Sequence, residues 1–149
     1  MLDLFAGTGA LSFEAISRGA RSAVIVDRDP RVIRSLERSA SDLGIDQHTR
    51  AMRLDLLRNP ATAVRKLPSA EHGFDLVFAD APYAEIAAVP SLLEELIAQG
   101  RLAPNAWVVI ERPATHDWAW PNGLAYDADY RYGQTGISLG VYEPEKGSQ

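Results

Sequence analysis

The chain lacks cysteine, has only two lysines and contains no hydrophobic run long enough to cross a membrane. Without cysteine it forms no disulfides and has no thiolate nucleophile, which fits a cytoplasmic protein. A membrane span needs roughly twenty apolar residues, and no signal peptide is visible. The three histidines, His48, His72 and His116, lack ligand spacing, so we expect no metal site. These absences argue against disulfide-stapled, membrane-spanning and zinc-dependent proteins.

Basic charge is also scarce. The 149 residues include 15 basic and 20 acidic side chains, for a net charge of −5. Tight, unaided RNA binding usually requires a basic patch, so this balance does not favour it. The length and a hydrophobic content of 46% predict one domain with a single core. We expect this domain over residues 1–143, a polar tail at 144–149, and a monomer.

Apolar runs of strand length alternate with helical patterns along the chain. The expected strands span residues 1–5, 21–27, 50–54, 74–79, 106–111, 126–132 and 136–142. The expected helices lie between Gly9 and Gly19 and at 30–43, 60–67 and 86–99. This alternation predicts an α/β fold with an open, mostly parallel sheet, helices on both faces and a C-terminal antiparallel hairpin.

A glycine turn follows the first expected strand in the segment Asp3-Leu-Phe-Ala-Gly-Thr-Gly9. Gly7 and Gly9 permit a sharp turn with close approach of the backbone to a ligand. Strand, glycine turn and helix form the first half of a nucleotide-binding unit. The dinucleotide fingerprint requires a third glycine where this chain has Ser12. The alternative is a tight connection that binds no ligand.

Two further aspartates close the second and third expected strands. Asp27 follows Gly7 by about twenty residues, where a carboxylate can accept hydrogen bonds from both hydroxyls of a ribose. Asp29 precedes Pro30 and is the better N-cap for the next helix, which leaves Asp27 for a ligand. Asp55 has two open interpretations, a ligand contact and a cap for the helix at 60–67.

The tetrapeptide Asp80-Ala81-Pro82-Tyr83 directly follows the apolar strand at 74–79. An exocyclic amino group could donate one hydrogen bond to Asp80 and one to the carbonyl of Ala81. Pro82 has a fixed φ and no competing N–H. Tyr83 offers a face on which a base can stack. A simple turn after a strand is the alternative.

Asp3, Asp27, Asp55 and Asp80 all fall at the carboxyl ends of expected strands. In open α/β sheets, ligands bind at this edge. Each aspartate alone can be explained by a structural role, such as capping a helix. Structural roles alone, however, would not require all four aspartates to lie at the same edge of the sheet. We therefore expect a ligand site there.

The two motifs resemble those of class I S-adenosylmethionine-dependent methyltransferases that modify exocyclic amino groups. Within this class, the segments 4–10, 14–20 and 132–135 resemble the bacterial RsmD-type family, which methylates the N2 amino group of a guanine in 16S ribosomal RNA. One departure is Ala81, which stands where the first proline of the motif is usual. A second is that the chain begins inside the first strand, whereas family members carry a basic segment before it. The resemblance therefore implies a chain without that segment.

The resemblance implies a Rossmann-like methyltransferase fold, the cofactor S-adenosyl-L-methionine, its product S-adenosyl-L-homocysteine, and 16S rRNA or the small ribosomal subunit as partner. The implied cofactor-binding residues are Asp3, Phe5, Gly7, Gly9, Asp27 and Asp55. The implied catalytic residues are Asp80, Ala81, Pro82 and Tyr83. Phe5 is also open to interpretation as a core aromatic.

Several alternatives remain open from the sequence. An NAD-dependent oxidoreductase is disfavoured by Ser12. A non-catalytic domain that binds S-adenosylmethionine, or that has lost its ligand, is the other alternative, and its support is Ala81 and the start of the chain inside the first strand. The same tetrapeptide also serves methylation of adenine N6 or glutamine N5. We expect Trp107 in the core, whereas Trp118 and Trp120 could form a hydrophobic plug or contact RNA.

Overall fold

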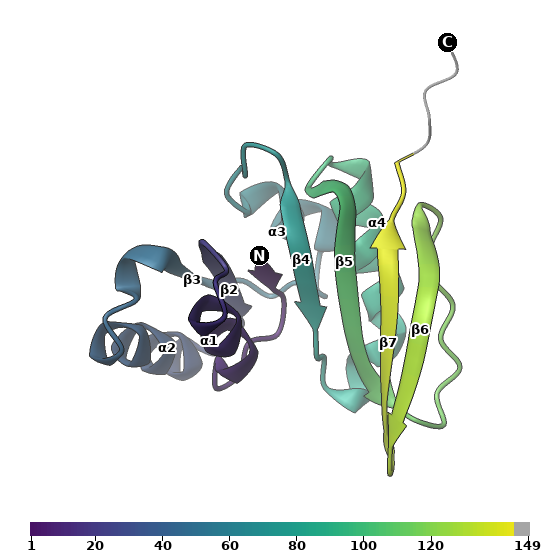
Figure 1. The fold of residues 1–149 in the computed structure, drawn as a ribbon, viewed down its shortest axis with the longest axis horizontal. Helices are drawn as coiled ribbons and strands as arrows, with labels where there is room; N and C mark the ends of the chain where they lie inside the picture. Colours follow the sequence, from purple (N-terminus) through teal and green to yellow (C-terminus); the bar gives the residue numbers. More distant parts are fainter. Residues whose placement is uncertain (145–149) are drawn as a thin grey trace.

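The computed structural model describes residues 1–144 and contains one seven-stranded sheet with helices on both faces (Figure 1). The strands are β1 (Leu2–Asp3), β2 (Ala23–Asp27), β3 (Thr49–Arg53), β4 (Phe74–Ala79), β5 (Leu102–Pro113), β6 (Leu124–Tyr132) and β7 (Thr135–Tyr142). The helices are α1 (Ala10–Ser17), α2 (Pro30–Asp42), α3 (Pro60–Lys66) and α4 (Val89–Ala98), with 3-10 turns η1 (Asp46–His48) and η2 (Tyr83–Ala88). The polar tail expected at 144–149 lies, beyond its first residue, outside the described residues.

The strand order is β3-β2-β1-β4-β5-β7-β6. Strands β1 to β5 pair in parallel, and β7 pairs antiparallel with both β5 and β6. The expected open parallel sheet with a C-terminal hairpin is therefore confirmed. The strand order reverses between β1 and β4, and such a switch point is where open α/β sheets bind ligands.

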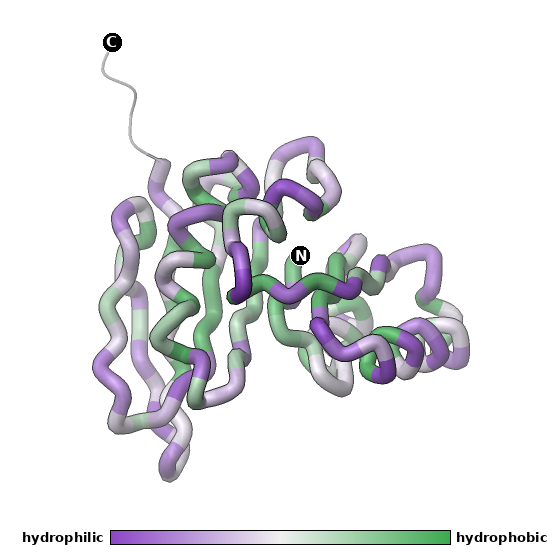
Figure 2. The backbone as a smooth tube through the Cα atoms, turned by 180° about the vertical axis from the view of Figure 1, so that it is seen from behind, coloured by the Kyte–Doolittle hydropathy of each residue, from purple (hydrophilic) through white to green (hydrophobic). Residues whose placement is uncertain are grey.

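The two faces of the sheet have separate cores. Helices α3 and α4 cover one face, where Val64, Leu92 and Leu93 pack with the inward side chains of β1, β4 and β5. Helices α1 and α2 lie over β1 to β3 on the other face, where Leu36 packs with Ile25. Figure 2 shows the hydrophobic positions gathered in the central strands and hydrophilic positions along the outer helix and hairpin.

One face of β4, β5, β7 and β6 is not covered by a helix within residues 1–144 (Figure 1). Trp107 lies on this face and is 42% exposed, so its expected place in the core is wrong. The alternation of β5 explains the error, because the neighbours Ala106 and Val108 point into the α4 core and Trp107 points away. Among the described residues, no helix is both long and apolar enough to span a membrane.

Candidate active site

A cavity of about 560 Å³ lies at the carboxyl edge of the strands, beside the switch point between β1 and β4. Its lining includes eight of the ten expected site residues: Phe5, Gly7, Asp27, Asp55, Asp80, Ala81, Pro82 and Tyr83. Asp3 and Gly9 do not line it. A larger hollow of about 1190 Å³ extends from the amino edge of β2 to β4 onto the sheet face that carries Leu76, Phe78 and Trp107, and it contains none of these ten residues. The segments that follow β1, β2, β3 and β4 thus converge on one cavity.

Glycine is needed at positions 7 and 9 of the turn for different structural reasons. Gly7 has φ +52° and lines the cavity, and a Cβ added there would meet no atom within 4 Å. Gly9 has φ +79°, and a Cβ there would come within 2.5 Å of Leu36 and 2.8 Å of Phe13. Gly7 therefore leaves space for a ligand, whereas Gly9 allows α1 to pack closely against α2.

Asp3 lies beneath the turn and is only 1% exposed. Its Oδ2 accepts a hydrogen bond of 2.8 Å from the hydroxyl of Ser12, whereas its Oδ1 has no hydrogen-bond partner within residues 1–144. Burial raises the pKa of Asp3 to about 6; the Ser12 bond opposes this rise, and the charges of Asp80 and Asp27 add to it. The residue that replaces the third glycine of the dinucleotide fingerprint thus binds the strand-end carboxylate, a role that the sequence analysis missed.

The buried charge of Asp3 leads to a stability prediction. Because its pKa rises from 3.8 unfolded to about 6 folded, the folded state binds the proton more tightly, and stability is lost as the pH rises through that window. Asp3→Asn should therefore raise the free energy of unfolding at pH 8 by about 1–3 kcal/mol. The gain should fade below about pH 4. Urea unfolding at several pH values measures this, and an equal effect at pH 4 and pH 8 would contradict it.

Asp27 is held by two backbone N–H groups. Its Oδ2 accepts from the Gly7 N–H at 3.1 Å, and its Oδ1 accepts from the Asp29 N–H at 2.9 Å. Asp29 in turn accepts from the N–H of Arg31 and caps α2, as expected. Each carboxylate oxygen can accept more than one hydrogen bond, so Asp27 retains capacity for a ligand.

Asp55 also lines the cavity, and it does not cap α3. Its Oδ1 accepts from the Arg58 N–H at 3.2 Å within the turn after β3. The cap of α3 is Asn59, whose side chain accepts from the Thr62 N–H at 3.0 Å. The capping interpretation of Asp55 is therefore wrong, which leaves the ligand interpretation.

The tetrapeptide forms the other wall of the cavity. Asp80 is half-buried, and burial raises its pKa above the ordinary value. Ala81 is buried in the α4 core, which holds the backbone of the motif against the sheet. The Tyr83 ring is 46% exposed, and its hydroxyl lies 3.2 Å from the Thr135 hydroxyl of β7. A base could thus stack on Tyr83 while its amino group meets Asp80.

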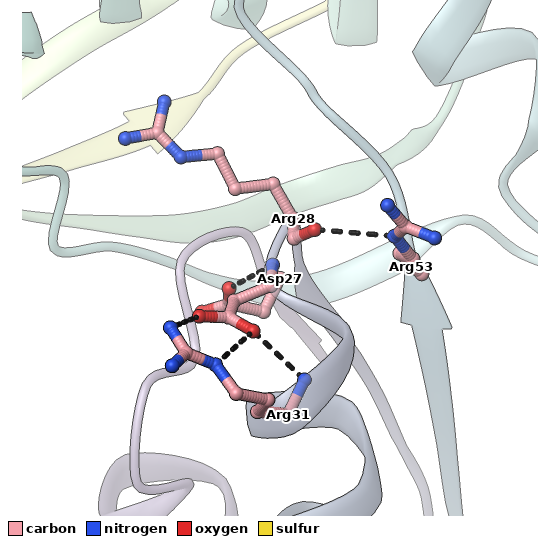
Figure 3. A network of polar contacts seen from close by, with 5 residues as sticks. Asp27, Arg28, Arg31 and Arg53 are labelled. Carbon is pink, nitrogen blue, oxygen red and sulfur yellow. Dashed lines mark hydrogen bonds and ion pairs between the residues drawn. The ribbon is translucent and has the colours of Figure 1, made fainter.

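Sequence reasoning missed an ion pair at the cavity. Arg28 follows β2, Glu85 lies in η2, and the Arg28 Nη1 is 2.6 Å from the Glu85 Oε1. Figure 3 shows the Arg28 side chain extending away from the polar network at the start of α2. The partners are 57 positions apart, so no local pattern could have indicated their contact.

Trp118 and Trp120 form a hydrophobic plug. Their ring centroids are 5.5 Å apart with planes nearly perpendicular, and both pack against the α4 core. A Cβ on Gly140 would come within 2.9 Å of the Trp120 ring, so β7 passes directly beneath it. These contacts favour the plug over an RNA contact.

The strand order, and a cavity lined by acidic strand ends, define a class I methyltransferase fold. Residues 1–141 match the family described as "Conserved hypothetical protein 95", and the chain belongs to that family. A Bacillus subtilis protein named "Putative rRNA methyltransferase YlbH" is 31% identical over 141 residues, which cover 93% of this chain and 73% of that protein. The Haemophilus influenzae "Ribosomal RNA small subunit methyltransferase D" is 28% identical over 110 residues, or 74% of this chain and 54% of that protein. The expected RsmD-type family is thereby confirmed.

Solved structures agree with this assignment. A conserved hypothetical protein from Streptococcus pyogenes is 29% identical with a TM-score of 0.84, covering 95% of this chain and 84% of that one. An RNA methyltransferase from Salinibacter ruber, solved in complex with S-adenosyl-L-homocysteine, has a TM-score of 0.69 over 99% of this chain and 83% of its own. At 16% identity, the second similarity supports the fold alone.

Proposed function

We propose that this chain is an S-adenosylmethionine-dependent methyltransferase that modifies the N2 amino group of a guanine in 16S ribosomal RNA. It works in the cytoplasm, as a monomer, on the RNA or the small ribosomal subunit. One observation carries the proposal. Asp80-Ala81-Pro82-Tyr83 forms one wall of a cavity whose other walls include Gly7 and Asp27. An amino-group site and a nucleoside site thus adjoin.

The cavity suits the cofactor in size and chemistry. Its volume of about 560 Å³ falls within the usual range for small-molecule sites. Gly7 leaves open space beside the backbone, and the Asp27 carboxylate faces that space with unused acceptor capacity. Asp27 would hold the ribose hydroxyls, and Asp55 would accept from the adenine amino group. The unpartnered Oδ1 of Asp3 adds negative charge beneath the turn, which favours the cationic amino-acid end of the cofactor.

The protein's contribution to chemistry is to orient the acceptor and accept a proton. When bound, the cofactor supplies an electrophilic methyl group on a sulfonium sulfur. Asp80 and the Ala81 carbonyl align the N2 lone pair with that methyl carbon, which is catalysis by proximity. With the cofactor bound, the methyl group would pass from sulfur to N2, and the C–S electron pair would stay on sulfur. The amino nitrogen then loses a proton, and the raised pKa of Asp80 makes it a stronger base for that step.

The decisive experiment incubates small ribosomal subunits that lack the modification with methyl-labelled cofactor, then maps the label. We expect it on N2 of one guanine. Label on adenine N6 or on a protein glutamine would refute the guanine assignment and retain the methyltransferase class. Cofactor binding without transfer to any acceptor would instead indicate a non-catalytic domain, and binding of NAD alone would indicate an oxidoreductase.

The ribose assignment of Asp27 is tested by affinity. Asp27→Ala should weaken binding of S-adenosylhomocysteine by about 1–3 kcal/mol, because two ribose hydroxyls would lose their acceptor. Isothermal titration calorimetry measures the change. Asp29→Ala is the matched control, since it removes the α2 cap beside Asp27 but lies outside the cavity lining. Equal losses in the two variants would assign the effect to the loop rather than to the ribose.

A further inference from the structure

We infer that Glu111 recognises the acceptor base beside Asp80, accepting a hydrogen bond from N1–H of the guanine whose N2 amino group Asp80 holds. This inference rests on the proposed function and adds the residue that selects the base. Glu111 lies near the end of β5, outside the cavity lining, where the sequence analysis assigned it no role.

Strand register places the two carboxylates side by side. Ala79, the last residue of β4, pairs with Ile110 of β5, so Asp80 follows directly after β4 beside Glu111 of β5. Adjacent strands lie about 4.8 Å apart. Ala79 and Ile110 both point into the α4 core. Because side chains alternate, Asp80 and Glu111 point to the opposite face, which no helix of residues 1–144 covers at β4 and β5.

The carboxylate of Glu111 is free to accept a hydrogen bond from a ligand. Within residues 1–144, its carboxylate has no hydrogen bond or ion pair from a side chain. The adjacent Arg112 points the other way and is occupied by the Ser138 hydroxyl at 2.8 Å and by Asp129 at 3.3 Å. Burial raises the pKa of Glu111, and the nearby Asp80 charge raises it further. The two neighbouring carboxylates of Asp80 and Glu111 are not paired with a basic side chain of residues 1–144. They therefore favour a ligand that presents adjacent hydrogen-bond donors.

Guanine has such an edge. Its N1–H and N2 amino groups are adjacent donors, which match two adjacent carboxylates. Adenine and cytosine instead place a ring-nitrogen lone pair beside their amino group, and that lone pair would face Glu111. A flipped base is read by hydrogen bonds to this Watson–Crick edge. The tetrapeptide alone accepts any suitable amino group, so Glu111 supplies the preference for guanine.

The test uses RNA in which 2-aminopurine replaces the target guanine. This base keeps the 2-amino group, but its N1 carries no hydrogen. The unaltered protein should favour guanine over 2-aminopurine in kcat/KM by about 10- to 100-fold, the effect of one hydrogen bond to a charged group. Glu111→Gln should reduce or invert the ratio, because its amide can donate to N1. Glu94→Gln, an exposed carboxylate on α4, is the matched control and should leave the ratio unchanged.

The outcomes separate the inference from the proposed function. Equal transfer to both bases by the unaltered protein, a comparison that needs no variant, would overturn the role of Glu111 and leave guanine methylation standing. A folded Glu111→Gln protein with the original preference would do the same. Absence of transfer to guanine by the unaltered protein would overturn both. Cofactor affinity should be the same with and without the Glu111 substitution, because Glu111 lies outside the cavity lining.

Discussion

Asp80→Asn should reduce methyl transfer by about 100- to 10,000-fold, the usual contribution of a positioned acid–base group. The amide keeps the shape of the side chain but is a far weaker proton acceptor, and an NH2 group replaces one carboxylate oxygen, so a donor opposes the amino group. Single-turnover transfer to unmodified small subunits, with enzyme in excess, measures the chemical step.

Cofactor affinity should change little in the same variant, because Asp80 is assigned to the acceptor base. Asp75→Asn is the matched control: it lies on the same strand at the opposite edge of the sheet, and its side chain is highly exposed. Full turnover by Asp80→Asn on ribosomal substrate would refute the amino-group mechanism. A parallel loss in Asp75→Asn would point to damage of β4 rather than of the chemistry.

Gly9→Ala should lower the free energy of unfolding by about 2–5 kcal/mol, whereas Gly7→Ala should chiefly weaken cofactor binding. Both residues have positive φ, so each substitution strains the backbone. Only at Gly9 would the new methyl group also enter a packed core, within 2.5 Å of the buried Leu36. At Gly7 the methyl group would enter open space that the ligand is expected to fill.

Urea unfolding gives the free energy of unfolding of both variants, and calorimetric titration gives their cofactor affinities. The two measurements should rank the variants in opposite order. The larger stability loss belongs to Gly9→Ala, and the larger affinity loss, relative to stability, belongs to Gly7→Ala. If both variants lost stability equally and bound the cofactor equally, the division of roles within the turn would be wrong.

The fold could be predicted from the sequence because its signals are local. The apolar run of β4 has the observed bounds, and α2 is marked by Asp29 and Pro30 at its start. The aspartates at strand ends were found for the same reason: parallel strands bring their carboxyl ends to one edge. Eight expected residues accordingly share one cavity.

The remaining features depend on contacts between distant segments. Ser12 could be placed on α1 from sequence, but its bond to Asp3 follows from how the helix packs over β1. The Arg28–Glu85 pair and the adjacency of Glu111 to Asp80 require the register and order of strands. The hydrophobicity of Trp107 predicts a place in the core. Its exposure depends instead on which sheet face the helices cover, and the sequence around Trp107 does not indicate that.

The concentration of carboxylates around the cavity has a consequence for turnover. Asp27, Asp55 and Asp80 line it and Asp3 lies beneath it, whereas the charge of Glu85 is paired with Arg28. S-adenosylmethionine carries one more positive charge than S-adenosylhomocysteine. The negative electrostatic potential of the cavity therefore attracts the cofactor more strongly than its product. Each methyl transfer removes the positive charge of the sulfonium, and the loss of this attraction favours dissociation of the product. Salt should therefore reduce the affinity difference between the two molecules, because it screens the field.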